Sequence, residues 1–391
     1  MKAFTPFKLK CIGLKNRLVK SATLKNMATP KGVPTEDTKR FFERLAHGGT
    51  GLIISGYAYV NEAGQSFPLQ NGIHNDKVIA EWQRITDAVH KLGSKIAMQI
   101  VHGGRQIKSK VLGGRKSLAP SAIPDLVYFT IPNPMTEADI RQTIQDFENA
   151  AARVKEAGFD AVQIHGAHGY LISSFLSPLT NRRRDGWGGD FERRFRFLAE
   201  TYNAVRRAVG SDFPVLYKLN IKDFVPLGTA PHESFQAAKR LAELGLDAIE
   251  ISGGINEMAF GMSRGGSFAD IISRDRSPLA GIYLKLVLGV EKLMLPFHEA
   301  YFLSYAEKLR PLVDIPIILV GGIRSPEMVE WIIESGSADL VSMARPLIRE
   351  PGLPNKWLEG NLQPAQCVSC NCCLGEVEQG NKLKCYYVKK P

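Results

Sequence analysis

Runs of consecutive apolar residues alternate with amphipathic stretches eight times along this chain of 391 residues. Parallel strands that are buried on both faces show such continuous apolar runs, and amphipathic stretches with a period near 3.6 residues are typical of helices packed on a sheet. We therefore expect eight strands, at residues 17–22, 51–55, 95–101, 160–165, 214–220, 247–252, 315–320 and 338–343.

Several of the helices between these strands carry start signals. Residues 76–92 repeat apolar side chains every three or four positions, which predicts one buried helix face. Thr136 and Asp139 stand in capping-box spacing before a further apolar repeat. Ser325 followed by Pro326 has the order expected of an N-cap and the first helical residue.

Eight strand-then-helix units predict an α/β fold, a (β/α)8 TIM barrel with an N-terminal cap and a short cysteine-rich C-terminal extension. The alternative is a doubly wound sheet, but no GxGxxG follows the first strand. We assign residues 1–360 to the barrel and 361–391 to the extension. Residues 253–297 are too long for a plain strand-to-helix loop, so we expect an inserted lid or substrate loop there.

Charge and cysteine placement narrow the class of protein. The net charge is +11, but Lys and Arg are spread along the chain, which disfavours nucleic acid and suits anionic ligands such as phosphates and coenzyme A esters. No apolar run is long enough to span a membrane, and we read no signal peptide. Five of the six cysteines lie in the last 25 residues, which favours a metal or cluster site in a reducing, cytoplasmic setting over a disulfide framework.

Active-site residues of such barrels come from the C-terminal ends of the strands. Gln99 and Lys218 are polar residues near the ends of buried strands, and an amide with a cation suits a flavin ring. A lysine–carboxylate pair that fills a barrel layer is the alternative. After the last two strands, Gly321-Gly322 and Ala344-Arg345 offer backbone N–H groups and one guanidinium to a phosphate, although a Gly-Gly pair also makes an ordinary tight turn.

His165, His168 and Tyr170 follow the fourth strand within six residues. Two imidazoles can hold and polarise a carbonyl oxygen, and a nearby phenol can donate a proton to carbon. The alternatives are a core histidine with an aromatic anchor, or a metal site. No HExxH motif or adjacent carboxylate supports the metal.

Taken together, these segments resemble the old yellow enzyme family of FMN-dependent oxidoreductases. The resemblance runs in order along nearly the whole chain and rests on LKNRLVKSAT, GGTGLIISG, QIVHGGRQ, HGAHGYLISSFLSPLTNRRRDGWGGDFERR, IEISGG, ILVGGIRSPE and ADLVSMARPLIREP. It implies the barrel already inferred and an NAD(P)H-dependent ene-reductase that reduces a small α,β-unsaturated carbonyl compound. A CoA thioester is one candidate substrate, and a homo-oligomer is one candidate assembly.

The resemblance also implies a role for each matching residue. His165 and His168 would bind the substrate oxygen, and Tyr170 would protonate the α-carbon after hydride reaches the β-carbon. FMN would be held by Ser21, Ala22, Thr23, Gly56, Gln99, Lys218, Gly321, Gly322, Ala344 and Arg345.

The last cysteines have the spacing C-x2-C-x2-C-x11-C, formed by Cys367, Cys370, Cys373 and Cys385, with Cys372 as a spare thiol. Thiolates at such spacing hold a [4Fe-4S] cluster or zinc, and free thiols are the third reading. The spacing is similar to the cluster site of longer family members, 2,4-dienoyl-CoA reductase and trimethylamine dehydrogenase. An alternative function is therefore an FMN and iron–sulfur dehydrogenase subunit that exchanges electrons with a partner protein.

Overall fold

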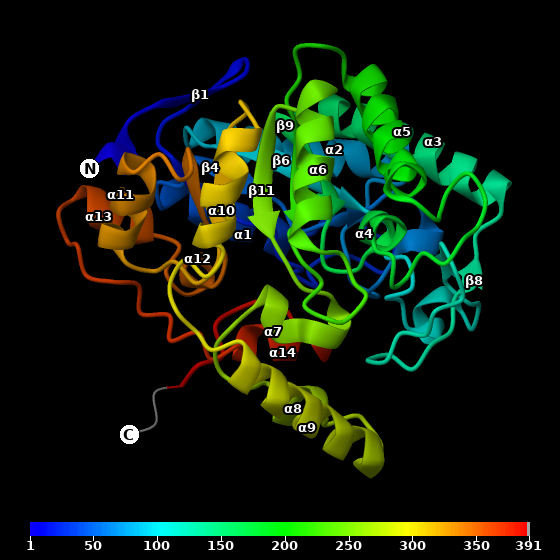
Figure 1. The fold of residues 1–391 in the computed structure, drawn as a ribbon. Coiled ribbons are helices and arrows are strands. Elements are labelled where there is room, and N and C mark those ends of the chain that lie inside the picture. Colours follow the sequence, from blue (N-terminus) through cyan, green and yellow to red (C-terminus); the bar gives the residue numbers. More distant parts are fainter. Residues whose placement is uncertain (389–391) are drawn as a thin grey trace.

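Eight parallel strands close into a barrel at the centre of the molecule (Figure 1). The computed structural model describes residues 1–388. Neighbouring strands pair in the order β4-β3-β13-β12-β11-β10-β9-β6, and β6 pairs with β4 to complete the ring. All eight predicted strands are confirmed: β3 (Leu18–Lys20), β4 (Leu52–Ile54), β6 (Lys95–Val101), β9 (Ala161–Gly166), β10 (Val215–Asn220), β11 (Ala248–Ser252), β12 (Ile317–Val320) and β13 (Leu340–Met343).

Helices surround the barrel on the outside. Thr136 and Asp139 form the predicted capping box at the start of α3, whereas the Ser325 hydroxyl donates to the Glu299 carboxylate at 2.8 Å instead of capping α11. The outer helices are α1 (Glu36–His47), α2 (Ile79–Lys91), α3 (Glu137–Glu156), α4 (Leu171–Leu176), α5 (Phe191–Val209), α6 (Pro231–Glu243), α10 (Leu303–Leu309), α11 (Pro326–Glu334), α12 (Arg345–Arg349) and α13 (Leu353–Leu358).

The lower layer of the barrel interior is apolar. An antiparallel hairpin, β1 (Phe7–Leu9) and β2 (Ile12–Leu14), covers the N-terminal end of the barrel and buries its apolar side chains in this layer. This hairpin is the predicted N-terminal cap. The layer is filled by Val19, Leu52, Ile54, Ala97, Ala161, Leu216, Ala248, Ile318 and Leu340.

The upper layer is polar, because side chains of a strand face the same way every second residue. In six of the strands, the residue two positions after the apolar residue of the lower layer is polar and buried. These polar residues are Ser21, Gln99, Gln163, Lys218, Glu250 and Ser342. Hydrogen bonds join these side chains across the barrel, so the C-terminal end of the barrel interior is charged and hydrogen-bonded.

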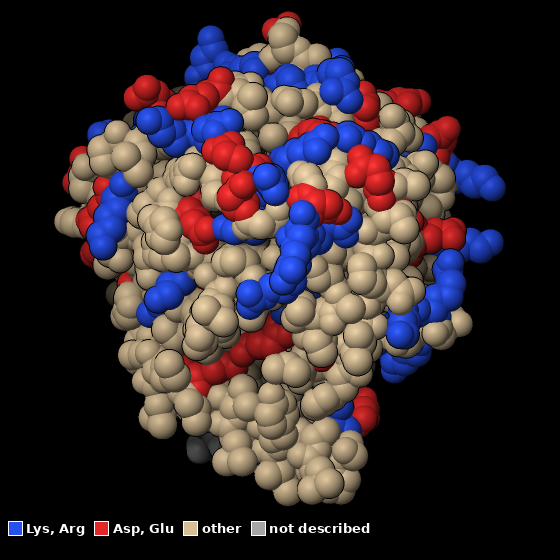
Figure 2. Space-filling model, turned by 45° about the vertical axis from the view of Figure 1, so that its right-hand side comes forward, with Lys and Arg blue, Asp and Glu red and all other residues tan. Residues whose placement is uncertain are grey.

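Residues 253–297 leave the barrel between β11 and α10 and project from its C-terminal face (Figure 1). They form α7 (Ala259–Met262), α8 (Ala269–Ile272) and α9 (Pro278–Met294). The inner side of α9 packs Leu284 and Leu288 against α7 and α8. Its outer side leaves Leu279, Leu286 and Leu293 mostly exposed, and the lower part of Figure 2 is accordingly almost free of charge.

The cysteine-rich extension folds back onto the barrel and forms α14 (Cys372–Glu378). The Asn26 amide donates to the Val377 carbonyl at 2.7 Å, and the Leu383 N–H donates to the Lys25 carbonyl at 2.9 Å. The extension is therefore tied to the loop after β3. The predicted extension ends at residue 391, and its last three residues, 389–391, lie outside the part of the chain that the structure describes. Among residues 1–388, the helices are all too short or too polar to cross a membrane.

Candidate active site

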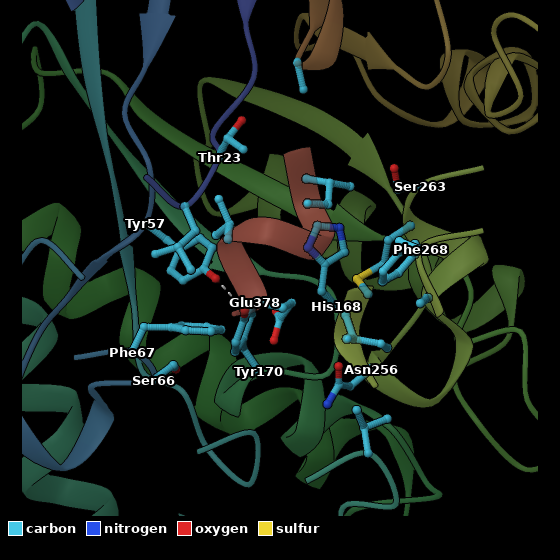
Figure 3. Close-up of a pocket in the computed structure, with 18 of the residues that line it drawn as sticks. Thr23, Tyr57, Ser66, Phe67, His168, Tyr170, Asn256, Ser263, Phe268 and Glu378 are labelled. Atoms are coloured by element: carbon cyan, nitrogen blue, oxygen red, sulfur yellow. Dashed lines mark hydrogen bonds between the residues drawn. The ribbon is translucent and has the colours of Figure 1, made fainter. Parts of the chain in front are cut away.

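A cavity of about 800 Å³ opens at the C-terminal ends of the barrel strands (Figure 3). Its wall combines strand ends with the excursion at residues 253–297 and with α14 of the extension. Three predicted site residues, Gly56, Gln99 and His165, lie behind this wall rather than on it. The other residues predicted to bind FMN or substrate line it: Ser21, Ala22, Thr23, His168, Tyr170, Lys218, Gly321, Gly322, Ala344 and Arg345.

His165, His168 and Tyr170 meet at one side of the cavity. β9 ends at Gly166, and His168 then adopts a φ of 67°, which turns the chain so that all three rings lie together. The His165 ring centroid is 5.2 Å from that of His168 and 4.9 Å from that of Tyr170. His168 Nε2 lies 2.7 Å from the Ser252 hydroxyl.

Both histidines are uncharged near neutral pH. Burial lowers the pKa of His168 to about 3, with a further lowering from the Lys218 cation. Burial, followed by His168 and Lys218, lowers the pKa of His165 well below its usual value. A neutral imidazole still donates one N–H, so the pair can polarise a carbonyl oxygen without binding a proton.

This burial predicts a pH-dependent stability. Between pH 6.5 and about 3 the unfolded chain binds a proton at His168 that the folded chain does not. The free energy of unfolding should be largest above about pH 6.5 and should fall by up to about 1.4 kcal/mol per pH unit, for this residue alone, as the pH drops through that window. Urea titrations at several pH values measure the slope. His168→Gln should reduce it, and an unchanged slope would contradict the assignment.

Tyr170 donates a hydrogen bond to the hydroxyl of Tyr57 at 2.9 Å (Figure 3). Tyr57 follows β4, so two distant segments meet here. Burial raises the pKa of Tyr170 above its ordinary value, and burial also raises that of Tyr57. Both phenols therefore carry their protons, which is the state required of a proton donor.

Lys218 lies between the polar barrel layer and the cavity. Its Nζ is 2.8 Å from Glu250 Oε2 and donates to the Ser21 hydroxyl at 3.1 Å. Burial alone would raise the pKa of Glu250, but Lys218 and the hydrogen bonds donated to the carboxylate hold it below its usual value. The predicted alternative, a buried lysine–carboxylate pair, is therefore present, and the same lysine also reaches the cavity.

The residues fit FMN at two points. Within residues 1–388, Gln99 Oε1 has no hydrogen-bond partner, although Gln99 Nε2 donates to Gln163 at 2.6 Å. In the same part of the chain, the N–H groups of Gly322, Ile323 and Ala344 have no protein acceptor. The Arg345 guanidinium, which donates to the Asn371 side chain at 2.5 Å, stands beside them. Free N–H groups next to a buried cation suit a phosphate.

Gly56 supports the site indirectly. A Cβ at this position would lie 2.1 Å from the carbonyl oxygen of Thr23, so only glycine lets the two strand-end loops approach. Gly56 therefore allows the segment around Thr23 to lie at the cavity wall.

The predicted cysteine set surrounds a second, small cavity. Cys367, Cys370, Cys373 and Cys385 all border it, while Cys372 does not. Arg345 borders both cavities. No group of three or more His, Cys, Asp or Glu side chains in residues 1–388 is placed to hold a metal ion.

The polar stretch NRRRDGWGG has a structural role. The Asn181 amide donates to the carbonyls of Phe175 and Trp187, both at 2.8 Å, which closes the loop between α4 and α5. The Arg183 guanidinium donates to the Met135 carbonyl at 2.7 Å. This stretch therefore joins the loop after β9 to the loop after β6.

Sequence reasoning missed several residues of the site. Glu250 carried a signal, because it interrupts the apolar strand AIEIS. Tyr57, Tyr128 and Glu378 carried none, since each is an ordinary polar or aromatic residue in a loop or at a helix end. Only the fold brings them to the cavity.

The comparison with known families decides what kind of protein this is. One family model matches residues 2–259 and 290–363. The chain belongs to the NADH:flavin oxidoreductase / NADH oxidase family. The resemblance to old yellow enzyme is confirmed, and the protein is an enzyme. The match omits residues 260–289, which contain α8, most of α7 and most of α9.

Relatives of this flavin oxidoreductase differ in length and in reaction. It is 36% identical to NADH oxidase of Thermoanaerobacter brockii over 95% of this chain and 53% of that protein. It is 33% identical to a metal reductase of Desulforamulus reducens over 98% of the chain and 52% of that protein. The chain thus spans about half the length of both. It matches 94% of 4,4'-dithiodibutanoate disulfide reductase of Rhodococcus erythropolis over 97% of its own length, at 33% identity.

Solved structures give the same fold. The old yellow enzyme homologue from Zymomonas mobilis superposes with a TM-score of 0.74 at 27% identity, covering 95% of this chain and 96% of that one. A complex of 2-naphthoyl-CoA reductase with 2-naphthoyl-CoA superposes with a TM-score of 0.85 over 98% of this chain and 56% of that one. Its identity is 24%, so this second likeness concerns the fold alone.

Proposed function

We propose that this enzyme is an FMN-dependent ene-reductase that adds hydrogen across the C=C bond of an α,β-unsaturated carbonyl compound. The observation that carries the proposal is the grouping of two neutral imidazoles with one protonated phenol. His168 and Tyr170 line the cavity, and the His165 ring packs directly behind them, with its centroid 5.2 Å and 4.9 Å from theirs. The free N–H groups near Arg345 lie on the wall of the same cavity and suit the phosphate of FMN.

In this mechanism the protein's own residues bind the flavin and the substrate, polarise the substrate carbonyl and protonate the α-carbon. FMN, when bound, supplies the hydride that NAD(P)H first donates. Gln99 would bind the pyrimidine edge of the flavin, and Lys218 would stand near its N1 and O2 atoms. His165 and His168 would donate hydrogen bonds to the substrate carbonyl oxygen as negative charge develops there. Tyr170 would give its proton to the α-carbon.

Anaerobic titration of the purified enzyme with NADH and with NADPH tests the proposal. We expect the flavin absorbance to bleach with at least one of them and to return when an enone such as cyclohexenone is added. An enzyme that is reduced but that no enone or enoyl-CoA reoxidises would not be an ene-reductase. Recovery only with a partner protein present would support the alternative, an electron-transferring dehydrogenase subunit.

The cavity also suits a substrate with a large apolar part. Phe268, Ile272, Leu284 and Leu288 of the excursion line it, opposite the polar barrel layer. We therefore assign the lid role to residues 253–297. Lys108 and Lys110 are also part of the wall, and two cations suit the phosphates of a CoA thioester. Comparing enoyl-CoA with the matching free enone tests this choice.

We further propose a [4Fe-4S] cluster at the cysteine-lined cavity. Zinc is the alternative, and a single zinc ion needs all its sulfur ligands about 2.3 Å from one point. A four-iron cluster binds each thiolate through a different iron, which spreads the sulfurs around a larger centre. Four cysteines around one cavity suit the larger group.

Serine substitutions distinguish cluster ligands from the spare thiol. Cys367→Ser, Cys370→Ser, Cys373→Ser and Cys385→Ser should each lower the iron content and the absorbance near 400 nm beyond the flavin bands. Cys372→Ser is the matched control, because Cys372 lies one residue from Cys373 but outside the cavity. We expect it to retain iron. Iron-free wild-type protein with full activity would overturn the cluster.

A further inference from the structure

The cysteine-rich extension contributes a carboxyl group to the catalytic cavity. Glu378 is the last residue of α14, and it lines the cavity together with Tyr57, Tyr128 and Tyr170. Figure 3 shows Glu378 beside the Tyr57 and Tyr170 side chains. Glu378 Oε2 accepts a hydrogen bond from the Tyr128 hydroxyl at 3.0 Å, and Oε1 accepts no side-chain hydrogen bond within residues 1–388.

The surroundings of this carboxyl favour its protonated form. Leu374 and Val377 of the same helix also line the wall, so the setting is largely apolar. Burial raises the pKa of Glu378, although Lys108 and the Tyr128 hydrogen bond partly oppose the rise. Lys108 Nζ stands 5.1 Å from the centre of the Tyr128 ring. Arg276 and Asp125 are the other charged groups that act on Glu378, with opposite signs.

The proposed reaction leaves Tyr170 in need of a proton. Once Tyr170 has protonated the α-carbon, it is a phenolate in a buried site, and the two neutral histidines beside it have little tendency to supply a proton. The nearest donor is the Tyr57 hydroxyl at 2.9 Å. Tyr57 is itself a weak acid in a buried site, so it can pass a proton on but needs a further source.

We propose that Glu378 is that source: a proton reservoir, supplied by the cysteine-rich extension, that resupplies Tyr170 through Tyr57 after each turnover. The Tyr57 O–H bond breaks as its proton moves to the Tyr170 phenolate. Water in the cavity then carries the Glu378 carboxyl proton to the Tyr57 phenolate, and the resulting carboxylate takes up one proton from bulk solvent. No electrons move in these steps. The inference rests on the proposed ene-reductase reaction.

A purely structural role for Glu378 makes a different prediction. If the carboxylate only held Tyr128 in place, removing either partner would alter the cavity wall and would slow the first hydride transfer. A reservoir acts only after the first proton has left Tyr170. The two roles can therefore be separated by comparing the first turnover with the second.

Double-mixing stopped-flow makes this comparison on the holoenzyme. Reduced enzyme receives one equivalent of enone, is reduced again, and receives a second equivalent after a variable delay. In Glu378→Gln we expect a normal rate of flavin reoxidation at the first addition. Recovery of that rate at the second addition should be at least about tenfold slower than in wild type. Glu378→Asp should recover more rapidly than the glutamine variant.

Each result has a definite meaning. Equal recovery in wild type and Glu378→Gln overturns the reservoir, as does an equal slowing of both additions in Glu378→Gln and Tyr128→Phe. If Glu378→Gln does not bind FMN, solvent deuterium decides: a larger isotope effect on recovery than on the first addition is expected in wild type, and equal effects overturn the inference. Wild type that no enone reoxidises would instead overturn the proposed function.

Discussion

Replacing Tyr170 with phenylalanine should slow the reoxidation of the reduced flavin by an enone about 10²–10⁴-fold. The phenol packs against His165 and donates a hydrogen bond to Tyr57, and phenylalanine keeps the ring packing while removing the hydroxyl. Reduction of the flavin by NAD(P)H needs no such proton and should stay within about twofold of wild type. Stopped-flow absorbance of the two half-reactions measures both.

Tyr57→Phe is the matched control for this experiment. It removes the hydroxyl that accepts the Tyr170 hydrogen bond but leaves the Tyr170 proton in place. Its first turnover should therefore remain much faster than that of Tyr170→Phe. Equal rates in wild type and Tyr170→Phe would show that another group, or water, protonates the α-carbon.

Removing the carboxylate of Glu250 should lower the free energy of unfolding by about 3–5 kcal/mol, because Glu250→Ala leaves the Lys218 charge buried without its partner. The substitution also removes the acceptor of the hydrogen bonds that Ser21 and Ser342 donate to the carboxylate. Urea unfolding, followed by fluorescence or circular dichroism, measures the change.

A double-mutant cycle separates the ion pair from the packing. Lys218→Met with Glu250→Ala removes both charges and should restore part of the stability that Glu250→Ala alone loses. If the loss of stability in the double variant, relative to wild type, equals the sum of the losses in the two single variants, the two side chains do not interact and the polar barrel layer has another basis.

Much of the fold could be predicted from the sequence, because its signals are local. Most residues of the eight strands are apolar at consecutive positions, and the start of α3 is coded by Thr136 and Asp139 three residues apart. The strand ends then placed Gln99, Lys218, His165 and the glycines after β12 on one face of the barrel, since all parallel strands end there.

The partners of these residues could not be predicted, because they are set by contacts between segments far apart in the chain. Gln163 and Glu250 interact across the barrel interior at 2.9 Å, although β10 lies between their strands. Tyr57 reaches Tyr170 from a loop 113 residues earlier. Glu378 reaches the cavity only because the extension folds back beside Asn26, and no local pattern codes for that return.

The position of α14 in the chain has a consequence for how the enzyme is made. Ribosomes add about 5–20 residues per second, and domains generally fold as they emerge. The strands that close the barrel end at Met343, whereas α14 begins at Cys372, so the barrel can close before the last wall of its catalytic cavity has been synthesised. A nascent chain at that point would hold an open, solvent-filled site, and the docking of α14 beside Asn26 would be the step that completes the cavity wall.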